Sequence, residues 1–228
     1  MVQWEQGQTW QEITNSYLNY IQFLGSRSQK IIVVFNGYSS SPTDHEHIRP
    51  TKNSCCSLQI RPYMIHLISR AKLMDNTHNK NQLIQLLSSI FRKCDIIVEQ
   101  CDNDAGTSIV RQALAVAETG SVEVRADDAD VLVMLVHHSS STNHYIFVTT
   151  SKGSYDVRKI REALPGKKWR YLLFCHVFSC CDSVSAIVGH GKTTLFDRFC
   201  AGDIDDHIKA FLGRLLTIVV VRAGVAIF

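Results

Sequence analysis

The chain has 228 residues, of which 45% are hydrophobic and 20% charged, and this composition is typical of a globular protein with a real core. Its formal net charge of +3 is too small to indicate a nucleic-acid partner by itself. The eight cysteines form no Cys-x-x-Cys pair and no zinc-site spacing, and no secretory signal is visible. We therefore expect an intracellular protein, nuclear or cytoplasmic, with reduced thiols rather than a disulfide framework. We expect no membrane span, because the apolar tail Leu215–Phe228 is short and contains Arg222.

Hydrophobic periodicity predicts helices and strands in alternation along most of the chain. The predicted helices are Thr9–Gly25, a helix within Tyr63–Leu73, Asn79–Phe91, Ser108–Glu118, Val157–Leu164, Trp169–Phe178 and Leu195–Cys200. The predicted strands before residue 160 include Ile31–Phe35, Asp95–Glu99 and His144–Thr150. This order predicts an α/β fold with a parallel sheet, followed by an all-helical end. We expect a core over residues 1–165 and a helical region over 166–228 in the same globule, cut short at its apolar C-terminal end.

The stretch Val122–Val136 joins two apolar runs through three carboxylates, Asp127, Asp128 and Asp130. Apolar runs rich in Val and Leu are typical of buried parallel strands, or of a strand followed by a buried helix. Acids at the carboxyl end of such a strand lie where open α/β sheets bind their ligands. Because crowded carboxylates repel one another, their clustering favours a bound cation. Asp127 is the expected bystander of the three.

Further acids follow other predicted elements. Asp102 and Asp104 come after the strand Asp95–Glu99, and Asp182 comes after the helix Trp169–Phe178. Carboxylates that converge from separate elements are the ligands that Mg²⁺ and Mn²⁺ prefer. The sequence therefore predicts a metal site, and the alternative is that these acids lie in solvated turns or cap helices.

The stretch Cys181–Phe196 contains Gly-His-Gly-Lys-Thr, which invites comparison with a phosphate-binding P-loop. That motif needs a glycine where this chain has Ala186, and it follows a strand, whereas this stretch follows a predicted helix. We therefore expect no nucleotide cofactor. The alternatives are a turn whose N–H groups and Lys192 contact a nucleic-acid backbone, or a plain tight turn between core helices.

Basic residues gather around the helix predicted at 157–164. They are Lys152, Arg158, Lys159, Arg161, Lys167, Lys168 and Arg170. Lys and Arg make most phosphate contacts in nucleic-acid complexes, so the group fits a nucleic-acid footprint, and a solvated helical face is the alternative. In the polar loop Tyr38–Pro50, His45 and His47 flank Glu46. Two interpretations are open: these residues form a zinc or phosphate contact, or they belong to a solvated loop.

Taken in order, these motifs resemble one family. Asn36–Gly37, Asp104–Ala105–Gly106, Asp128–Ala129–Asp130, Cys181–Asp182 and Gly189–Lys192 resemble the XPG/flap-endonuclease-type PIN-like domains, of the kind found in uncharacterised transposon-associated proteins of invertebrates. The resemblance covers about Ile31–Asp205. It implies a PIN-like parallel sheet flanked by helices, a C-terminal helix–turn–helix clamp at Asp182–Phe196, and Mg²⁺- or Mn²⁺-dependent, structure-selective cleavage of DNA or RNA.

The resemblance also assigns residues to roles. It implies that Asp104, Asp128, Asp130 and Asp182 bind metal and that the first three are catalytic. It implies nucleic-acid contacts by Arg49, Lys167, Lys168, Gly189, Gly191 and Lys192. It leaves the oligomeric state open.

Several positions depart from the family pattern. Asn36 and Gly106 stand where the family has acids, Cys180 replaces a glycine, and Pro50 replaces an arginine. An earlier strand that carries another metal-site aspartate is not recognisable before Trp4–Gly25. Because a two-metal site depends on its ligands for catalysis, we expect impaired or absent nuclease activity. The alternative is a non-catalytic nucleic-acid-binding or scaffold module of mobile-element origin.

Overall fold

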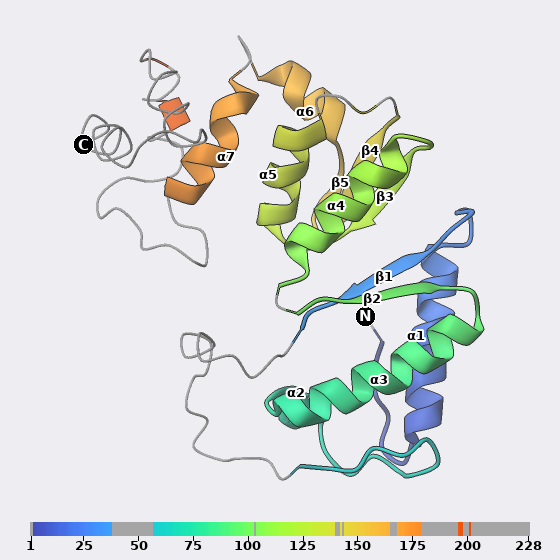
Figure 1. The fold of residues 1–228 in the computed structure, drawn as a ribbon. Helices are drawn as coiled ribbons and strands as arrows, with labels where there is room; N and C mark the ends of the chain where they lie inside the picture. Colours follow the sequence, from blue (N-terminus) through green and yellow to red (C-terminus); the bar gives the residue numbers. More distant parts are fainter. Residues whose placement is uncertain are drawn as a thin grey trace. The chain divides into compact units, whose positions relative to one another are not determined.

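The computed structural model describes residues 2–37, 57–102, 104–139, 142, 144–164, 168–178, 196–197 and 201 (Figure 1). These residues belong to two compact units, Met1–Ala105 and Gly106–Phe228. In the described part the fold is mixed α/β, with seven helices and five strands. No helix in these ranges is both long enough and apolar enough to cross a membrane.

Unit 1 is built on two helices that pack against each other and on a short sheet. Its elements are α1 (Trp10–Leu24), β1 (Ile32–Phe35), α2 (Arg70–Met74), α3 (Thr77–Lys93) and β2 (Ile97–Gln100). Helix α1 begins at Trp10, after the N-cap Thr9, because Thr9 and Glu12 satisfy each other's backbone N–H groups in a capping box. The apolar faces of α1 and α3 bury Trp10, Ile13, Leu83, Leu87 and Phe91 in one core.

The strands β1 and β2 pair in parallel, with Ile32 opposite Ile97 and Phe35 opposite Gln100. Two helices, α2 and α3, connect them, as a parallel pair requires. Because the paired strands end together, the residues that follow Phe35 and Gln100 leave the sheet at the same edge. That edge carries Asn36 and the acids after β2.

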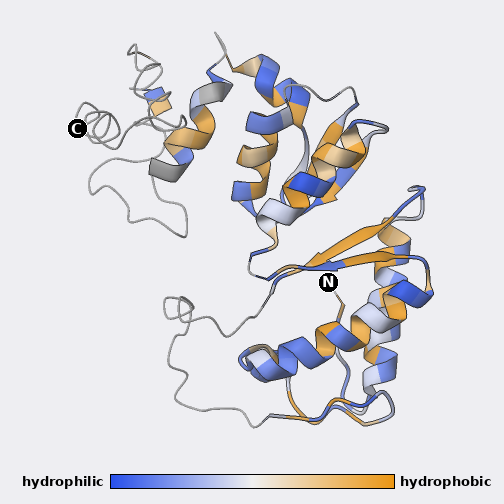
Figure 2. Cartoon of the chain, in the orientation of Figure 1, coloured by the Kyte–Doolittle hydropathy of each residue, from blue (hydrophilic) through white to orange (hydrophobic). Residues whose placement is uncertain are grey.

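Unit 2 places helices around a three-stranded sheet. Its elements are α4 (Gly106–Ala117), β3 (Val122–Arg125), α5 (Ala129–His138), β4 (Ile146–Thr150), β5 (Gly153–Asp156), α6 (Val157–Ala163) and α7 (Trp169–Phe178). The strand order is β3-β4-β5, with β3 and β4 parallel and β4 and β5 antiparallel. The core is formed by buried residues of α4, β3, α5, β4 and α6, including Ala117, Val131, Leu135, Val148 and Val157. Figure 2 shows the hydrophobic residues concentrated on the strands and on one face of the helices.

Most predicted elements are present, with one correction. The helix expected within Tyr63–Leu73 is confined to Arg70–Met74, and Tyr63 and Leu67 are exposed at 87% and 90%. The second apolar run of Val122–Val136 is helix α5, which agrees with the alternative of a strand followed by a buried helix. The predicted parallel pairing is present in β1–β2 and β3–β4, while β5 adds an antiparallel edge.

Other expectations fall on residues outside the described ranges and stay predictions. They are the boundary near residue 165, the loop Tyr38–Pro50, the clamp from Asp182 to Lys192 and most of the helix Leu195–Cys200. The PIN-like arrangement of the sheet also stays a prediction. Among the described cysteines, Cys94, Cys101 and Cys175 are free thiols.

Candidate functional site

Asp128 lies where the chain passes from β3 into α5. It is the N-cap of α5, with an extended backbone, and its Oδ1 accepts a hydrogen bond of 2.8 Å from the backbone N–H of Asp130. A carboxylate at this position satisfies an otherwise unpaired N–H and interacts favourably with the helix dipole. Asp128 is exposed, so its carboxylate combines a capping role with access to solvent. The local sequence Asp-Ala-Asp therefore both starts the helix and presents two carboxylates at its first turn.

Asp130 lies in the first turn of α5 and is held by a residue of α7. Its Oδ1 lies 2.6 Å from Nε2 of His176, and the side chains are 37% and 10% exposed respectively. With an ionised carboxylate, Nε2 of His176 must carry the proton and donate it. The contact fixes one oxygen of Asp130 and ties the start of α5 to α7.

His176 was not among the residues selected from the sequence. Its only sequence signal is an ionisable side chain within the apolar run of Trp169–Phe178. Forty-six positions separate it from Asp130, so the pairing depends on how α5 and α7 pack.

Asp127 has a structural role. Its Oδ1 accepts a hydrogen bond from the backbone N–H of Ser151, in the turn between β4 and β5. The backbone and side chain of Ser151 stabilise the ionised carboxylate and lower the pKa of Asp127. The bond joins the loop after β3 to the neighbouring turn of the same sheet.

In unit 1, the carboxyl ends of β1 and β2 lie against each other. The side-chain Oδ1 of Asn36 accepts a hydrogen bond of 3.0 Å from the backbone N–H of Ala105. A Cβ on Gly37 would lie only 2.0 Å from the carbonyl oxygen of Cys101, so glycine is required for this approach. Asn36 is thus bonded to the residue between Asp104 and Gly106 in the sequence.

The metal ligands implied by the family resemblance are distributed over both units. Asp104 is an exposed residue of unit 1, and Asp128 and Asp130 belong to unit 2, so their convergence stays a prediction. The described residues contain no group of three or more His, Cys, Asp or Glu side chains that could hold a metal, and Asp182 lies outside them. Asp128 and Asp130 supply oxygen ligands of the right kind, but each already has one oxygen in a hydrogen bond. The described part of the chain therefore supplies carboxylates of the implied ligand set without gathering three of them in one group.

The implied nucleic-acid contacts are mostly outside the described ranges. This applies to Arg49, Lys167, Gly189, Gly191 and Lys192. Lys168 is described: it is partly buried immediately before α7, and its carbonyl accepts a hydrogen bond from the N–H of Tyr171. Gly106 is buried as the first residue of α4.

Comparison of the chain with protein-family models, with curated proteins and with solved structures gave no match. The function is therefore inferred from the residues of this chain and from the geometry of its two units.

Proposed function

We propose that this chain is a nuclease-type domain of the XPG/flap-endonuclease PIN-like kind, with impaired Mg²⁺- or Mn²⁺-dependent cleavage of DNA or RNA. The observation that carries the proposal is the hydrogen bond between Asn36 and the N–H of Ala105. This bond joins Asn36, the first position that lacks the family's acid, to Ala105, which lies between Asp104 and the second such position, Gly106. Neutral residues therefore stand at both positions where the family has an acid, Asn36 at the end of β1 and Gly106 at the start of α4.

The charge lost at these positions weakens cation binding there. An amide oxygen carries no net charge, so Asn36 is a poorer ligand for a hard cation than a carboxylate, and Gly106 offers no side-chain ligand. In the proposed site Asp104, Asp128, Asp130 and Asp182 would hold the metal. A bound Mg²⁺ or Mn²⁺ supplies activation of water and neutralisation of phosphate charge.

His176 is a positioning residue in this proposal. Its bond to Asp130 fixes the carboxylate at the first turn of α5, where the capping bond of Asp128 fixes the neighbouring acid. Both acids are thus oriented by bonds within unit 2, independently of any cation. Such preorganisation limits the side-chain entropy lost when a ligand binds.

The second candidate is a non-catalytic nucleic-acid-binding module of mobile-element origin. The neutral residues at 36 and 106 favour it, because they remove acids that cleavage needs and that backbone binding does not. In this candidate the basic residues of α6 and Lys168 contact phosphates.

The test is a cleavage assay with Mn²⁺ on flap, bubble and single-stranded DNA, combined with a salt titration of DNA binding. We compare the wild-type chain with Asn36→Asp, Asp128→Asn and the control Asp95→Asn. Asp95 is an exposed acid with a φ of 59°, a conformation that asparagine tolerates. An aspartate at 36 keeps an oxygen for the Ala105 N–H, and an asparagine at 128 keeps the helix cap.

We expect slow cleavage by the wild-type chain, faster cleavage by Asn36→Asp, loss in Asp128→Asn and no change in the control. Robust wild-type turnover that disappears in Asp128→Asn would contradict the impaired-enzyme proposal. Salt-dependent DNA binding without cleavage in any variant would favour the second candidate. Absence of both binding and cleavage would exclude both.

A further inference from the structure

Unit 2 contains a cavity of about 400 Å³ at the other end of α5 from Asp128. It is lined by residues at the end of α5, at the start of β4, on α6 and at the start of α7. Helix α5 has ten residues, so its length of about 15 Å separates the cavity from the acids at its N-terminus. The cavity is therefore distinct from the acids of the proposed metal site at the start of α5.

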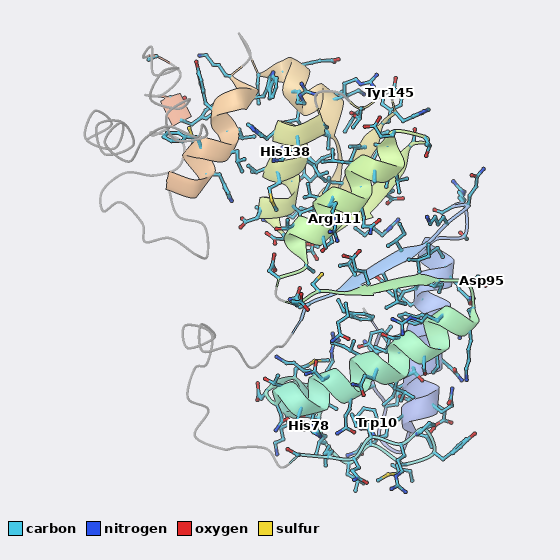
Figure 3. All side chains as sticks on the ribbon, viewed as in Figure 1. Trp10, His78, Asp95, Arg111, His138 and Tyr145 are labelled. Atoms are coloured by element: carbon cyan, nitrogen blue, oxygen red, sulfur yellow. The ribbon has the colours of Figure 1, made fainter. Side chains whose placement is uncertain are left out.

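Two arginines on α6 line the cavity, and each is stacked on an aromatic ring. The guanidinium carbon of Arg161 lies 4.3 Å from the centroid of Trp169, and that of Arg158 lies 4.4 Å from the centroid of Tyr145 (Figure 3 labels Tyr145). Stacking fixes the plane of a guanidinium and leaves its N–H edge available for an oxyanion. The two side chains are thus oriented before any ligand binds.

The positive charge of this pair is not balanced by an ion pair within the described residues. Arg158 and Arg161 are one helical turn apart, and burial together with the charge of Arg158 lowers the pKa of Arg161. Nε of Arg161 is buried and has no hydrogen-bond partner among the described atoms. An unpaired buried donor is costly, so an anion that contacts the outer N–H groups of Arg161 would offset part of this cost.

The rest of the lining adds groups that bind a polar ligand. Thr142 and His144 supply a hydroxyl and an imidazole, and Glu162 supplies a carboxylate. Two arginines and one glutamate leave the lining net positive. A carboxylate in the lining disfavours a ligand that is anionic throughout, and it can accept a hydrogen bond from a hydroxyl or amino group.

We propose that this cavity binds a phosphate monoester, with its phosphate on Arg158 and Arg161. Arginine forks match the oxygens of phosphate. The two neighbouring arginines repel each other, so they favour a phosphate with two negative charges over a singly charged anion. The volume is at the small end of the range for ligand pockets, which fits a phosphate with a small organic group. The phosphate can belong to a free small molecule or to the end of a nucleic-acid strand.

The experiment uses the full chain and isothermal titration calorimetry with four probes. The probes are inorganic phosphate, adenosine monophosphate, and one single-stranded oligonucleotide with a 5′-phosphate or a 5′-hydroxyl. The variants are Arg158→Gln, Arg161→Gln and Arg161→Lys, with Lys159→Gln as the control. Lys159 is an exposed lysine on the same helix that does not line the cavity, so its loss changes net charge equally.

We expect saturable binding of phosphate or adenosine monophosphate, weakened about tenfold or more by Arg158→Gln and by Arg161→Gln, because each removes a charge-assisted contact. Lys159→Gln should change affinity less than about twofold, and Arg161→Lys should recover part of the binding. A preference for the 5′-phosphate over the 5′-hydroxyl oligonucleotide that depends on Arg158 would assign the ligand to strand ends. Equal binding of the two oligonucleotides, together with binding of the small probes, would assign the ligand to a free phosphate.

Absence of saturable binding for every probe would overturn the proposal, as would equal weakening by Lys159→Gln. Arg158 is exposed, so Arg158→Gln still tests the proposal if Arg161→Gln disturbs folding. Circular dichroism of each variant would reveal such a disturbance. Asp128→Asn should leave phosphate binding unchanged, so this site and the proposed nuclease function can fail separately.

Discussion

Replacing Gly37 with alanine should destabilise unit 1 strongly. An added Cβ would lie 2.0 Å from the carbonyl oxygen of Cys101 and 2.2 Å from the carbonyl carbon and oxygen of Asp102. All three obstacles are backbone atoms, so no side-chain rotation relieves the overlap. Gly37 does not have a positive φ, so the cost is purely steric.

The expected cost combines two contributions. Overpacking costs up to about 3 kcal/mol when the surroundings cannot adapt. Displacing the chain at this point also breaks the bond between Asn36 and Ala105, which contributes about 1 kcal/mol. A total of about 4 kcal/mol would raise the unfolded fraction about a thousandfold, out of a total stability of about 5–15 kcal/mol for a domain.

The assay is urea unfolding of the full chain, with hydrogen–deuterium exchange of peptides from β1 and β2 to localise the effect in unit 1. The control is Gly120→Ala, because a Cβ at Gly120 meets nothing within 4 Å and its φ is not positive. A Gly37→Ala variant within about 0.5 kcal/mol of the wild-type chain would refute the close approach of β1 and β2 at this edge. Equal destabilisation by Gly120→Ala would do the same.

Three further predictions concern unit 2. Leu135→Ala should cost about 2–5 kcal/mol because Leu135 is 0% exposed in the core, whereas Leu67→Ala, at a 90% exposed residue, should cost almost nothing; urea unfolding measures both. Asp128→Ala should cost about 1 kcal/mol through loss of the cap of α5, and Asp128→Asn should cost little, which thermal unfolding would reveal. Burial and the neighbouring charge of His138 lower the pKa of His137, so folding disfavours its protonated form. The free energy of unfolding should therefore decline as pH falls from about 6.5, the pKa of histidine in the unfolded chain, through the lower pKa of His137 in the folded chain. His137→Gln should flatten this pH dependence, which melting curves between pH 5 and 8 would measure.

The local structure of the chain can be predicted from its residue pattern alone. Apolar spacing predicted α1, α3 and α7, and β-branched runs predicted β1 and β3, because periodicity reports which side of an element is buried. Asp128 was recognisable as a helix cap or a ligand from its position before an apolar run, and the structure assigns it the capping role. These features depend on neighbours within a few residues.

Which distant residues meet depends on how the helices and strands pack. Asp130 pairs with His176 across 46 positions, and Asn36 with Ala105 across 69, because packing of helices and strands brings the chain segments together. The stacking of Arg161 on Trp169 and of Arg158 on Tyr145 likewise depends on how α6 packs against its neighbours. A basic run in the sequence fits a solvated face and a ligand cavity equally well. The distance between side chains distinguishes the two, and that distance is set by the packing of the elements, which a pattern of residue types does not contain.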